Sequence, residues 1–541
     1  MYDILIRGGW LVDGTGNPVY RADVGISGGR IVALGRLEGA DAAQCIDATG
    51  LLVSPGFIDC HSHTDWSIHA NPLAQSTIRQ GVTTEIVGNC GYSSAPLHGA
   101  SRGTVTSRLR THVYQGPCNW TTFAEYLDAI RALGTSCNLG FLVGHNALRE
   151  AAGIEGAQGS AAQHERLEAL TREALEAGAL GMSTGLEFEP GRLAPTEELV
   201  RLGRVLGEYD ALYASHIRNR DAHLQAAIEE FVTIVRAGNE GGGFLRGEVS
   251  HLNVRYGSGA PEGGWERAVE TVQRARDEGL DVLADTTPYA DGIGQLAAIL
   301  PPWVKEGGAA STAARLRDPA VRARLRGDCD RYWRFIHRGE WGRVRMARNA
   351  LFPELSGLSF PEIAALRGCD EWDCCFDILA AHGERLDSLF VIGAIKADDL
   401  LVKMATHPLY SLASDGYSSS TDPTFRIPCA HPIHYAGMLH YLTHYVRDRG
   451  VLRLEDAVRK MTSMPATHFG LADRGLLTPG YWADVVVFDL AALEEVSTIE
   501  RPEAYVRGVQ HVLVNGTPVV SAGAHTGARS GRVLLRCELS V

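Results

Sequence analysis

The chain has 541 residues, of which 45% are hydrophobic and 21% charged, and its formal net charge is −13. This length and hydrophobic content allow a large buried core, and one α/β barrel can take up more than half of such a chain. The acidic balance disfavours a nucleic acid or an anionic membrane as the main partner, because both favour clustered Lys and Arg.

The chain opens on short strands. Residues 1 to about 50 alternate apolar and polar positions between Gly-Gly and Asp-Gly pairs, which is typical of strands joined by tight turns. From about residue 51 strands alternate with amphipathic helices, as in HERLEALTREALEAGALG at 164–181 and LYASHIR at 212–218. This alternation predicts βαβ units and a parallel sheet.

Residues 300–400 are predicted to be a mostly helical elaboration of this scaffold. From about residue 475 the strand pattern returns in GLLTPGYWADVVVFDL, so we expect the two chain ends to pair in one small β domain. No basic and apolar leader opens the chain and no apolar run could span a bilayer, which predicts a cytoplasmic protein.

The 11 cysteines are scattered, which is typical of buried thiols rather than of a disulfide framework. The tightest cluster, CDEWDCC at 369–375, has neither a CxxC spacing nor a flanking histidine. A helix start capped by Asp370 or Asp373 is therefore favoured over a metal site there.

Two histidines end an apolar run in the stretch GFIDCHSHTDWSIH at 56–69. Side chains alternate along a strand, so His61 and His63 point to the same face. They follow LLVSPGFIDC and so lie at the carboxyl end of a strand, the rim at which a parallel barrel keeps its active site. A metal site is favoured over two ordinary core histidines.

Other strand ends supply matching partners. Cys90 follows TTEIVGN, His216 ends LYASH, His251 ends GEVSH, and Asp415 follows YSLAS. Singly, each residue also fits a structural role, as a buried thiol, a core imidazole or a turn former. Together they offer thiolate, imidazole and carboxylate, which is the mixture that zinc prefers. The spacing leaves open whether His61 and His63 complete one metal site or hold a second ion.

The chemistry follows from such a metal. A catalytic zinc lowers the pKa of bound water to about 7 and polarises a carbonyl group. A carboxylate beside it can carry a proton from the water to a leaving amine, and Asp415 is the candidate. The sequence thus predicts an enzyme that hydrolyses a small-molecule amide.

The segments PGFIDCHSH at 55–63, QGVTTEIVGNCGYSSAPL at 80–97, ASDG at 413–416 and ADVVVFD at 483–489 resemble the amidohydrolase superfamily. Within it the chain most resembles the D-aminoacylases (N-acyl-D-amino-acid deacylases), over almost its whole length. The resemblance implies an α/β fold, with a (β/α)8 TIM-like barrel at 55–470 that carries a helical insertion at about 300–400. It also implies a small β-sandwich built from residues 1–54 and 471–541.

The resemblance also implies roles for the strand-end residues. Cys90, His216 and His251 would hold a tightly bound Zn²⁺. His61 and His63, with Cys90 and Asp415, would line a weaker second position. Asp415 would be the general acid/base in the hydrolysis of a linear amide.

Three positions depart from the family pattern. Ile433 stands where the family has an arginine thought to grip the substrate's α-carboxylate, Asn253 where it has a lysine, and Phe188 where it often has a tyrosine. Losing a bidentate carboxylate clamp costs a charge-assisted hydrogen bond of about 1.5–3 kcal/mol. These departures predict an altered substrate unless Arg426 or Arg218 takes over.

The candidate substrate-binding residues are Arg218, Tyr289 and Arg426. The alternatives to a linear-amide hydrolase are a cyclic amide hydrolase of the hydantoinase or dihydropyrimidinase type and a non-catalytic metal-binding homologue. The sequence is compatible with a homo-oligomer. It also places residues 330–400 where a lid over the Asp415 strand would lie.

Overall fold

The computed structural model describes residues 1–328, 336, 338–349 and 351–536. Its centre is a parallel sheet of eight strands in the order β16-β12-β11-β10-β9-β8-β7-β6. These strands are β6 (Phe57–Asp59), β7 (Val82–Val87), β8 (Asn138–Gly144), β9 (Gly181–Gly185), β10 (Leu212–His216), β11 (Arg246–Val249), β12 (Val282–Thr286) and β16 (Tyr410–Leu412). Most of their residues are buried, as expected for a sheet that helices cover.

The first and last strands of this sheet meet just beyond their carboxyl ends. A parallel bridge joins Ser62 to Gly416. Two backbone bonds flank the bridge, from Asp415 N to His61 O at 2.8 Å and from His63 N to Gly416 O at 2.7 Å. The sheet therefore closes on itself, which confirms the predicted barrel.

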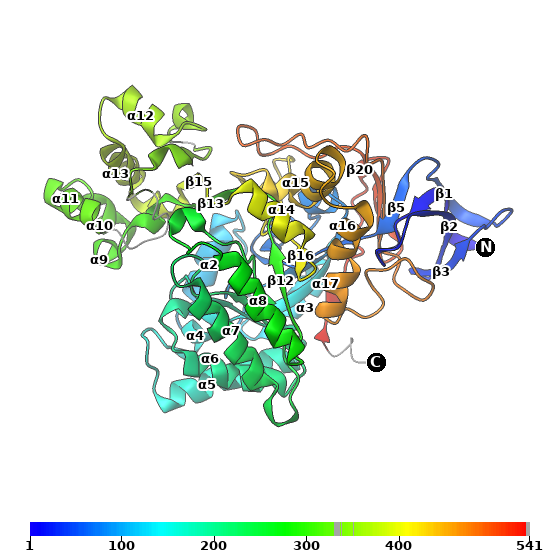
Figure 1. The fold of residues 1–541 in the computed structure, drawn as a ribbon, viewed down its shortest axis with the longest axis horizontal. Coiled ribbons are helices and arrows are strands. Elements are labelled where there is room, and N and C mark those ends of the chain that lie inside the picture. The colour runs from blue at the N-terminus through cyan, green and yellow to red at the C-terminus, as the bar shows by residue number, and fades with distance from the viewer. Residues whose placement is uncertain (329–335, 337, 350, 537–541) are drawn as a thin grey trace.

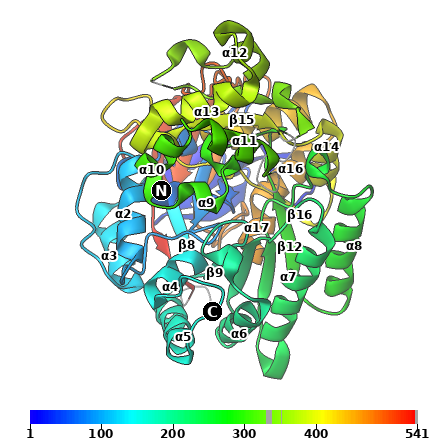
Figure 2. The same ribbon diagram turned by 90° about the vertical axis from the view of Figure 1, so that its left-hand side faces the viewer.

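Helices lie outside the barrel, and Figure 2 shows α4 to α8 side by side along it. The helices that follow barrel strands are α1 (Gln75–Ile78), α2 (Ser101–Thr111), α3 (Phe123–Leu133), α4 (His145–Ala152), α5 (Ala161–Glu176), α6 (Thr196–Gly207), α7 (Leu224–Gly238), α8 (Gly264–Asp277), α14 (Asp398–Thr406), α15 (Ile433–His440), α16 (Leu454–Met461) and α17 (Ser463–His468). In α7 the buried residues Leu224, Ile228, Phe231 and Val235 recur at helical spacing and form the face that packs on the sheet. No helix in the described ranges is long and apolar enough to cross a membrane.

The chain ends form a second sheet, which has nine strands in the order β20-β19-β18-β17-β5-β1-β2-β3 with β4 beside β1. Its strands are β1 (Tyr2–Leu11), β2 (Tyr20–Ser27), β3 (Arg30–Gly35), β4 (Ala42–Asp47), β5 (Leu52–Pro55), β17 (Val485–Phe488), β18 (Val509–Val514), β19 (Thr517–Ser521) and β20 (Ala524–His525). Antiparallel pairing of β17 with β5 joins the two ends, as the sequence predicts. One segment differs: β21 (Val533–Leu534) leaves this sheet and pairs with β8 of the barrel.

An insertion separates β12 from β16. It contains the predicted helices, which are α9 (Pro302–Lys305), α10 (Gly308–Arg315), α11 (Pro319–Gly327), α12 (Phe360–Arg367) and α13 (Glu371–His382). The side chain of Asp370 accepts a bond from Asp373 N at 2.8 Å, so the predicted cap of α13 is confirmed. The insertion packs around a core of its own, in which Phe360 and Phe376 are fully buried.

The insertion also contains a three-stranded antiparallel sheet, which the sequence did not predict. Its strands are β13 (Asp291–Gln295), β15 (Phe390–Ala394) and β14 (Val344–Met346), with β15 in the middle. Figure 1 shows the insertion at one end of the molecule and the terminal sheet at the other. The predicted lid at 330–400 lies partly on residues 330–335, 337 and 350, which are outside the described residues.

Candidate metal centre and active site

Three of the predicted site residues lie in tight turns at the strand ends. Cys90, His251 and Asp415 have φ angles of 54°, 32° and 60°, in a region that residues other than glycine seldom adopt. Such backbone conformations cluster at functional sites, because the surrounding structure has to hold them in place. Each turn lies at the mouth of the barrel.

The thiol of Cys90 lies at the centre of the site. Its Sγ atom is 3.3 Å from His251 Nε2, 3.4 Å from His61 Nε2 and 3.5 Å from His216 Nδ1. A tetrahedral zinc with ordinary bond lengths would hold a sulfur and a nitrogen ligand about 3.6 Å apart. The spacing of Cys90, His216 and His251 therefore fits one zinc ion.

A second donor group shares the same thiol. Asp415 Oδ1 lies 3.2 Å from His63 Nε2 and 3.6 Å from His61 Nε2. Within each group all candidate ligand atoms lie within 4.8 Å of one another. The structure thus brings together all the residues that the sequence proposed as metal ligands, in two groups that overlap at Cys90.

Exposure separates the proton carrier from the other donors. The side chain of Asp415 is 33% exposed, against 0% for His61 and 9% for His63. Burial raises the pKa of Asp415, but the charge of His251 and the hydrogen bond from His63 outweigh it and lower the pKa below its usual value. Asp415 is therefore ionised and can be reached from the open side of the site.

Two carboxylates that the sequence analysis did not identify orient the histidine rings. Asp285 Oδ2 lies 3.2 Å from His61 Nδ1, and its Oδ1 accepts a bond from His251 N at 2.8 Å. Glu187 Oε2 lies 2.7 Å from His216 Nε2. A carboxylate on the far ring nitrogen fixes the tautomer of a ligating histidine and raises its basicity. The only signals in the sequence were an acid within a buried strand and an acid in the loop after β9.

Arginines surround Glu187. Arg255 forms two bonds to its carboxylate, at 2.8 and 2.9 Å, and Arg220 forms a third at 3.1 Å. Burial raises the pKa of Glu187, but these arginines outweigh it and hold the pKa well below its usual range. Glu187 therefore stays an anion and can accept the proton of His216.

The thiol of Cys90 is held in its reactive form in the same way. Burial raises its pKa, but the charges of His251 and His61 outweigh burial and bring the pKa well below its usual value. The thiolate is the form of cysteine that ligates a metal.

The predicted substrate residues are less well placed. Arg218 forms two bonds of 2.9 Å to Glu230 and bonds to two backbone carbonyls, so its guanidinium is used in holding β10 to α7. Arg426 forms an ion pair with Glu503. Tyr289 donates to Glu495 at 3.1 Å and packs its ring against His431. Neither arginine is free to take the place of the missing clamp.

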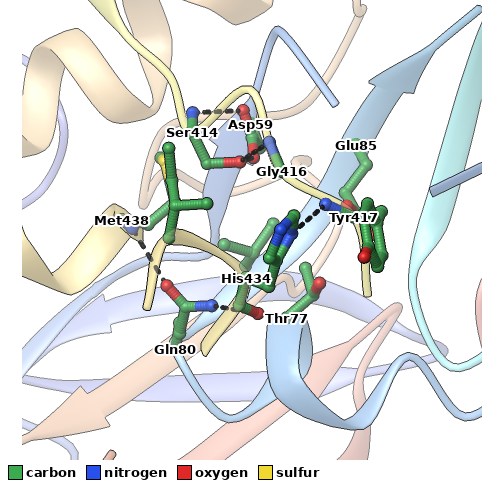
Figure 3. A pocket seen from close by; sticks show the side chains of 11 residues that line it. Asp59, Thr77, Gln80, Glu85, Ser414, Gly416, Tyr417, His434 and Met438 are labelled. Carbon is green, nitrogen blue, oxygen red and sulfur yellow. Dashed lines mark hydrogen bonds between the residues drawn. The ribbon is translucent and has the colours of Figure 1, made fainter. Parts of the chain in front are cut away.

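A small hollow lies next to the Asp415 loop (Figure 3), and Ile433 is among the residues that line it. On one side of the hollow, Asp59 accepts a bond from Ser414 N at 3.0 Å. On another, His434 Nδ1 accepts a bond from Tyr417 N at 3.1 Å. These bonds fix the loop on both sides of Asp415, and Ile433 supplies no charge there.

A model of the amidohydrolase family matches residues 44–520. The chain belongs to the amidohydrolase family. Two relatives from Alcaligenes xylosoxydans xylosoxydans cover nearly all of it. A D-aminoacylase is 34% identical over 99% of this chain and 98% of its own, and an N-acyl-D-glutamate deacylase is 35% identical over 99% and 96%.

A solved structure with a similar fold contains ligands. The crystal structure of an N-acyl-D-glutamate deacylase from Bordetella bronchiseptica contains zinc and a phosphonate inhibitor that mimics the tetrahedral intermediate of its reaction. It covers 99% of each chain with 32% identity and a TM-score of 0.78. The predicted resemblance to the D-aminoacylases is confirmed.

Proposed function

We propose that this amidohydrolase is a zinc-dependent N-acyl-D-amino-acid deacylase, which hydrolyses the linear amide of its substrate to an acid and a D-amino acid. The observation that carries the proposal is the single thiolate of Cys90 shared by two donor groups, one of which contains Asp415. The names of the most similar relatives support the same reaction class.

Cys90, His216 and His251 would hold the tightly bound zinc, and His61, His63 and Asp415, with Cys90, a weaker second ion. When bound, zinc acts as a Lewis acid that polarises the amide carbonyl and makes water acidic enough to act as a nucleophile at neutral pH. Glu187 and Asp285 orient the rings of His216 and His61, so that the other nitrogen of each ring faces the Cys90 thiol.

Asp415 moves the proton. Its carboxylate accepts a proton at Oδ from the attacking water as the new carbon–oxygen bond forms. The same oxygen then delivers the proton to the amide nitrogen, so that the carbon–nitrogen bond breaks and a neutral amine leaves. The backbone bond from Asp415 N to His61 O, at 2.8 Å, holds the residue at the required place.

The alternative of a cyclic amide hydrolase has less support, since the two curated relatives with high coverage carry deacylase names. A non-catalytic role is disfavoured because a structural metal does not require the ionised and partly exposed Asp415. The small-molecule substrate is part of the proposal. The cytoplasmic location and the homo-oligomer stay predictions.

The test is a substrate panel with the zinc-loaded protein and its Asp415→Asn variant. The panel contains N-acetyl-D-amino acids, their L-forms, and hydantoin and dihydrouracil. We expect hydrolysis of the D-acids by the wild type and at least a 100-fold lower rate with the variant. Ring opening of the cyclic amides without hydrolysis of any linear amide would overturn the proposal.

A further inference from the structure

Lys396 lies just after strand β15, which ends at Ala394. The backbone N–H groups of Ile395 and Lys396 both bond to Ala290 O, at 3.3 and 3.1 Å. Ala290 belongs to the loop that follows β12, so the unpredicted sheet of the insertion is tied to the mouth of the barrel at this point. β12 lies between β11 and β16, the strands that precede His251 and Asp415.

The side chain of Lys396 reaches into the same region. Its Nζ atom donates to Thr287 Oγ1 at 2.5 Å and to Tyr289 O at 2.8 Å. Thr287 Oγ1 also accepts a bond from Asn253 Nδ2 at 3.1 Å. Asn253 follows His251 by two residues, so the ammonium lies beside the loop that carries a proposed zinc ligand.

The ammonium of Lys396 has capacity for another ligand. An ammonium group has three hydrogens to donate, and two are used here. Among the residues that the structure describes, no carboxylate forms an ion pair with Lys396, whereas Arg220, Arg218 and Arg426 all bind glutamates. Burial lowers the pKa of Lys396 to about 7, although the charge of Asp415 acts in the opposite direction.

A second donor without an acceptor lies nearby. His431 Nδ1 accepts a bond from Ile433 N at 3.1 Å, which leaves the hydrogen of the neutral ring on Nε2. In the described part of the chain, Nε2 has no hydrogen-bond partner, although His431 is 1% exposed. The His431 ring packs against Tyr289, whose backbone oxygen accepts the bond from Lys396 Nζ. A buried donor without a partner costs about 1–3 kcal/mol, which an arriving acceptor would recover.

We propose that Lys396 binds the carboxylate of the substrate, with His431 Nε2 as a second donor, and so supplies from the insertion the cation that positions 253 and 433 lack. The inference rests on the proposed deacylase function, whose substrate carries such a carboxylate. Lys396 is a substrate-binding residue in this role and takes no part in moving the proton.

The test compares Lys396→Met with Lys403→Met. Lys403 is an exposed lysine on α14 that pairs with Glu266 at 3.0 Å, so it controls for the loss of one lysine in this part of the chain. The substrates are an N-acetyl-D-amino acid and the same compound with its carboxylate converted to the amide. For the acid we expect Lys396→Met to raise KM by about 10- to 100-fold, because a charge-assisted hydrogen bond is lost.

For the amidated compound we expect KM to change by less than about threefold, since no carboxylate is present to lose its partner. Lys396→Arg should keep part of the affinity for the acid, and Lys396→Gln, which also removes the charge, replaces the methionine variant if that protein fails to fold. Thermal unfolding and zinc content of each variant are measured alongside.

Each contrary result has a separate meaning. If the wild type hydrolyses the acid and Lys396→Met has the same KM as Lys403→Met, the role of Lys396 is wrong and the deacylase function stands. An equal loss with acid and amide, or a loss confined to kcat, would also overturn the carboxylate role. If the wild type hydrolyses no N-acetyl-D-amino acid, the proposed function itself fails.

Discussion

His63 Nε2 lies 3.2 Å from Asp415 Oδ1, although the two residues follow the first and the last strand of the barrel. The bridge between Ser62 and Gly416 brings these strand ends together. The Ser62–Gly416 bridge therefore closes the barrel and also places the proposed proton carrier, Asp415, beside His61 and His63. Each proposed role can be tested by a single substitution.

Asp415→Asn keeps the size of the side chain and removes its ability to carry a proton. We expect kcat to fall by about 10²- to 10⁴-fold, while the tightly bound zinc is retained, because its donors Cys90, His216 and His251 are unchanged. Steady-state kinetics and metal analysis measure the two effects. Asp210→Asn is the control, since Asp210 also has a positive φ, of 51°, and is exposed. A loss of less than threefold in the Asp415 variant would contradict the role.

Cys90→Ser and His63→Asn should affect metal binding differently. Cys90 belongs to both donor groups and His63 to one. The serine variant is expected to lose nearly all bound zinc on dialysis, whereas the His63 variant keeps the tight ion and loses the weaker one. Metal content by mass spectrometry distinguishes the two, and Cys45→Ser, at an exposed cysteine, provides the control. Full zinc content in the Cys90 variant would show that the thiolate is not a ligand.

Glu187→Gln should weaken zinc binding without removing a ligand. The amide cannot hold His216 and two arginines as the carboxylate does, and loss of such a partner lowers metal affinity by about 10- to 100-fold. Competition with a chelator of known affinity measures the change. Glu189→Gln alters an exposed glutamate two residues away, which pairs with Arg192 at 3.2 Å, and should leave the affinity unchanged. Equal affinities for the two variants would contradict this role of Glu187.

His468 predicts a pH dependence of stability. Burial lowers its pKa, but the carboxylates of Asp281 and Glu248, 3.6 and 3.0 Å from its ring nitrogens, outweigh burial and raise the pKa from 6.5 to about 9. The folded state thus holds a proton that the unfolded state releases above pH 6.5. The stabilisation that protonated His468 gains from Asp281 and Glu248 is fully present below pH 6.5 and is lost as the pH rises toward 9.

We therefore expect His468→Gln to destabilise the protein at pH 6 and to flatten its stability profile between pH 7 and pH 9, by about 1–3 kcal/mol. Urea unfolding at a series of pH values gives the profile. His223→Gln, at an exposed histidine, should leave the wild-type slope unchanged. A variant of His468 with that same slope would show that the pair is not protonated as proposed.

The clustering of the candidate donor residues could be predicted because each one interrupts an apolar run at the end of a strand, which is a local pattern. Asp285 and Glu187 gave no comparable signal, because each acts on a histidine that is distant in the sequence. Asp285 faces His61, 224 residues away, and Glu187 faces His216, 29 residues away. The sheet of β13, β14 and β15 was missed for a related reason. Its first strand, DGIGQ, is short and rich in glycine, and it is stabilised by pairing with a segment about 100 residues later.

The position of Lys396 was equally hidden from local patterns. Its ammonium donates a hydrogen bond to Thr287, which is 109 residues away in the sequence. Most of the insertion lies between the two residues, and its sequence predicted only a helical elaboration of the barrel. The departures at Asn253 and Ile433 could be recognised from the sequence alone, but the compensating residue required the fold.

The Ser62–Gly416 bridge, which closes the barrel, also limits the order in which the site can be assembled during synthesis. Ser62 and Gly416 are 354 residues apart, and the whole insertion is made between β12 and β16. The proposed tight-zinc donors Cys90, His216 and His251 all precede the insertion. A growing chain therefore contains a full set of zinc ligands long before Asp415 exists, and metal capture can come first while hydrolytic competence waits for the last barrel strand.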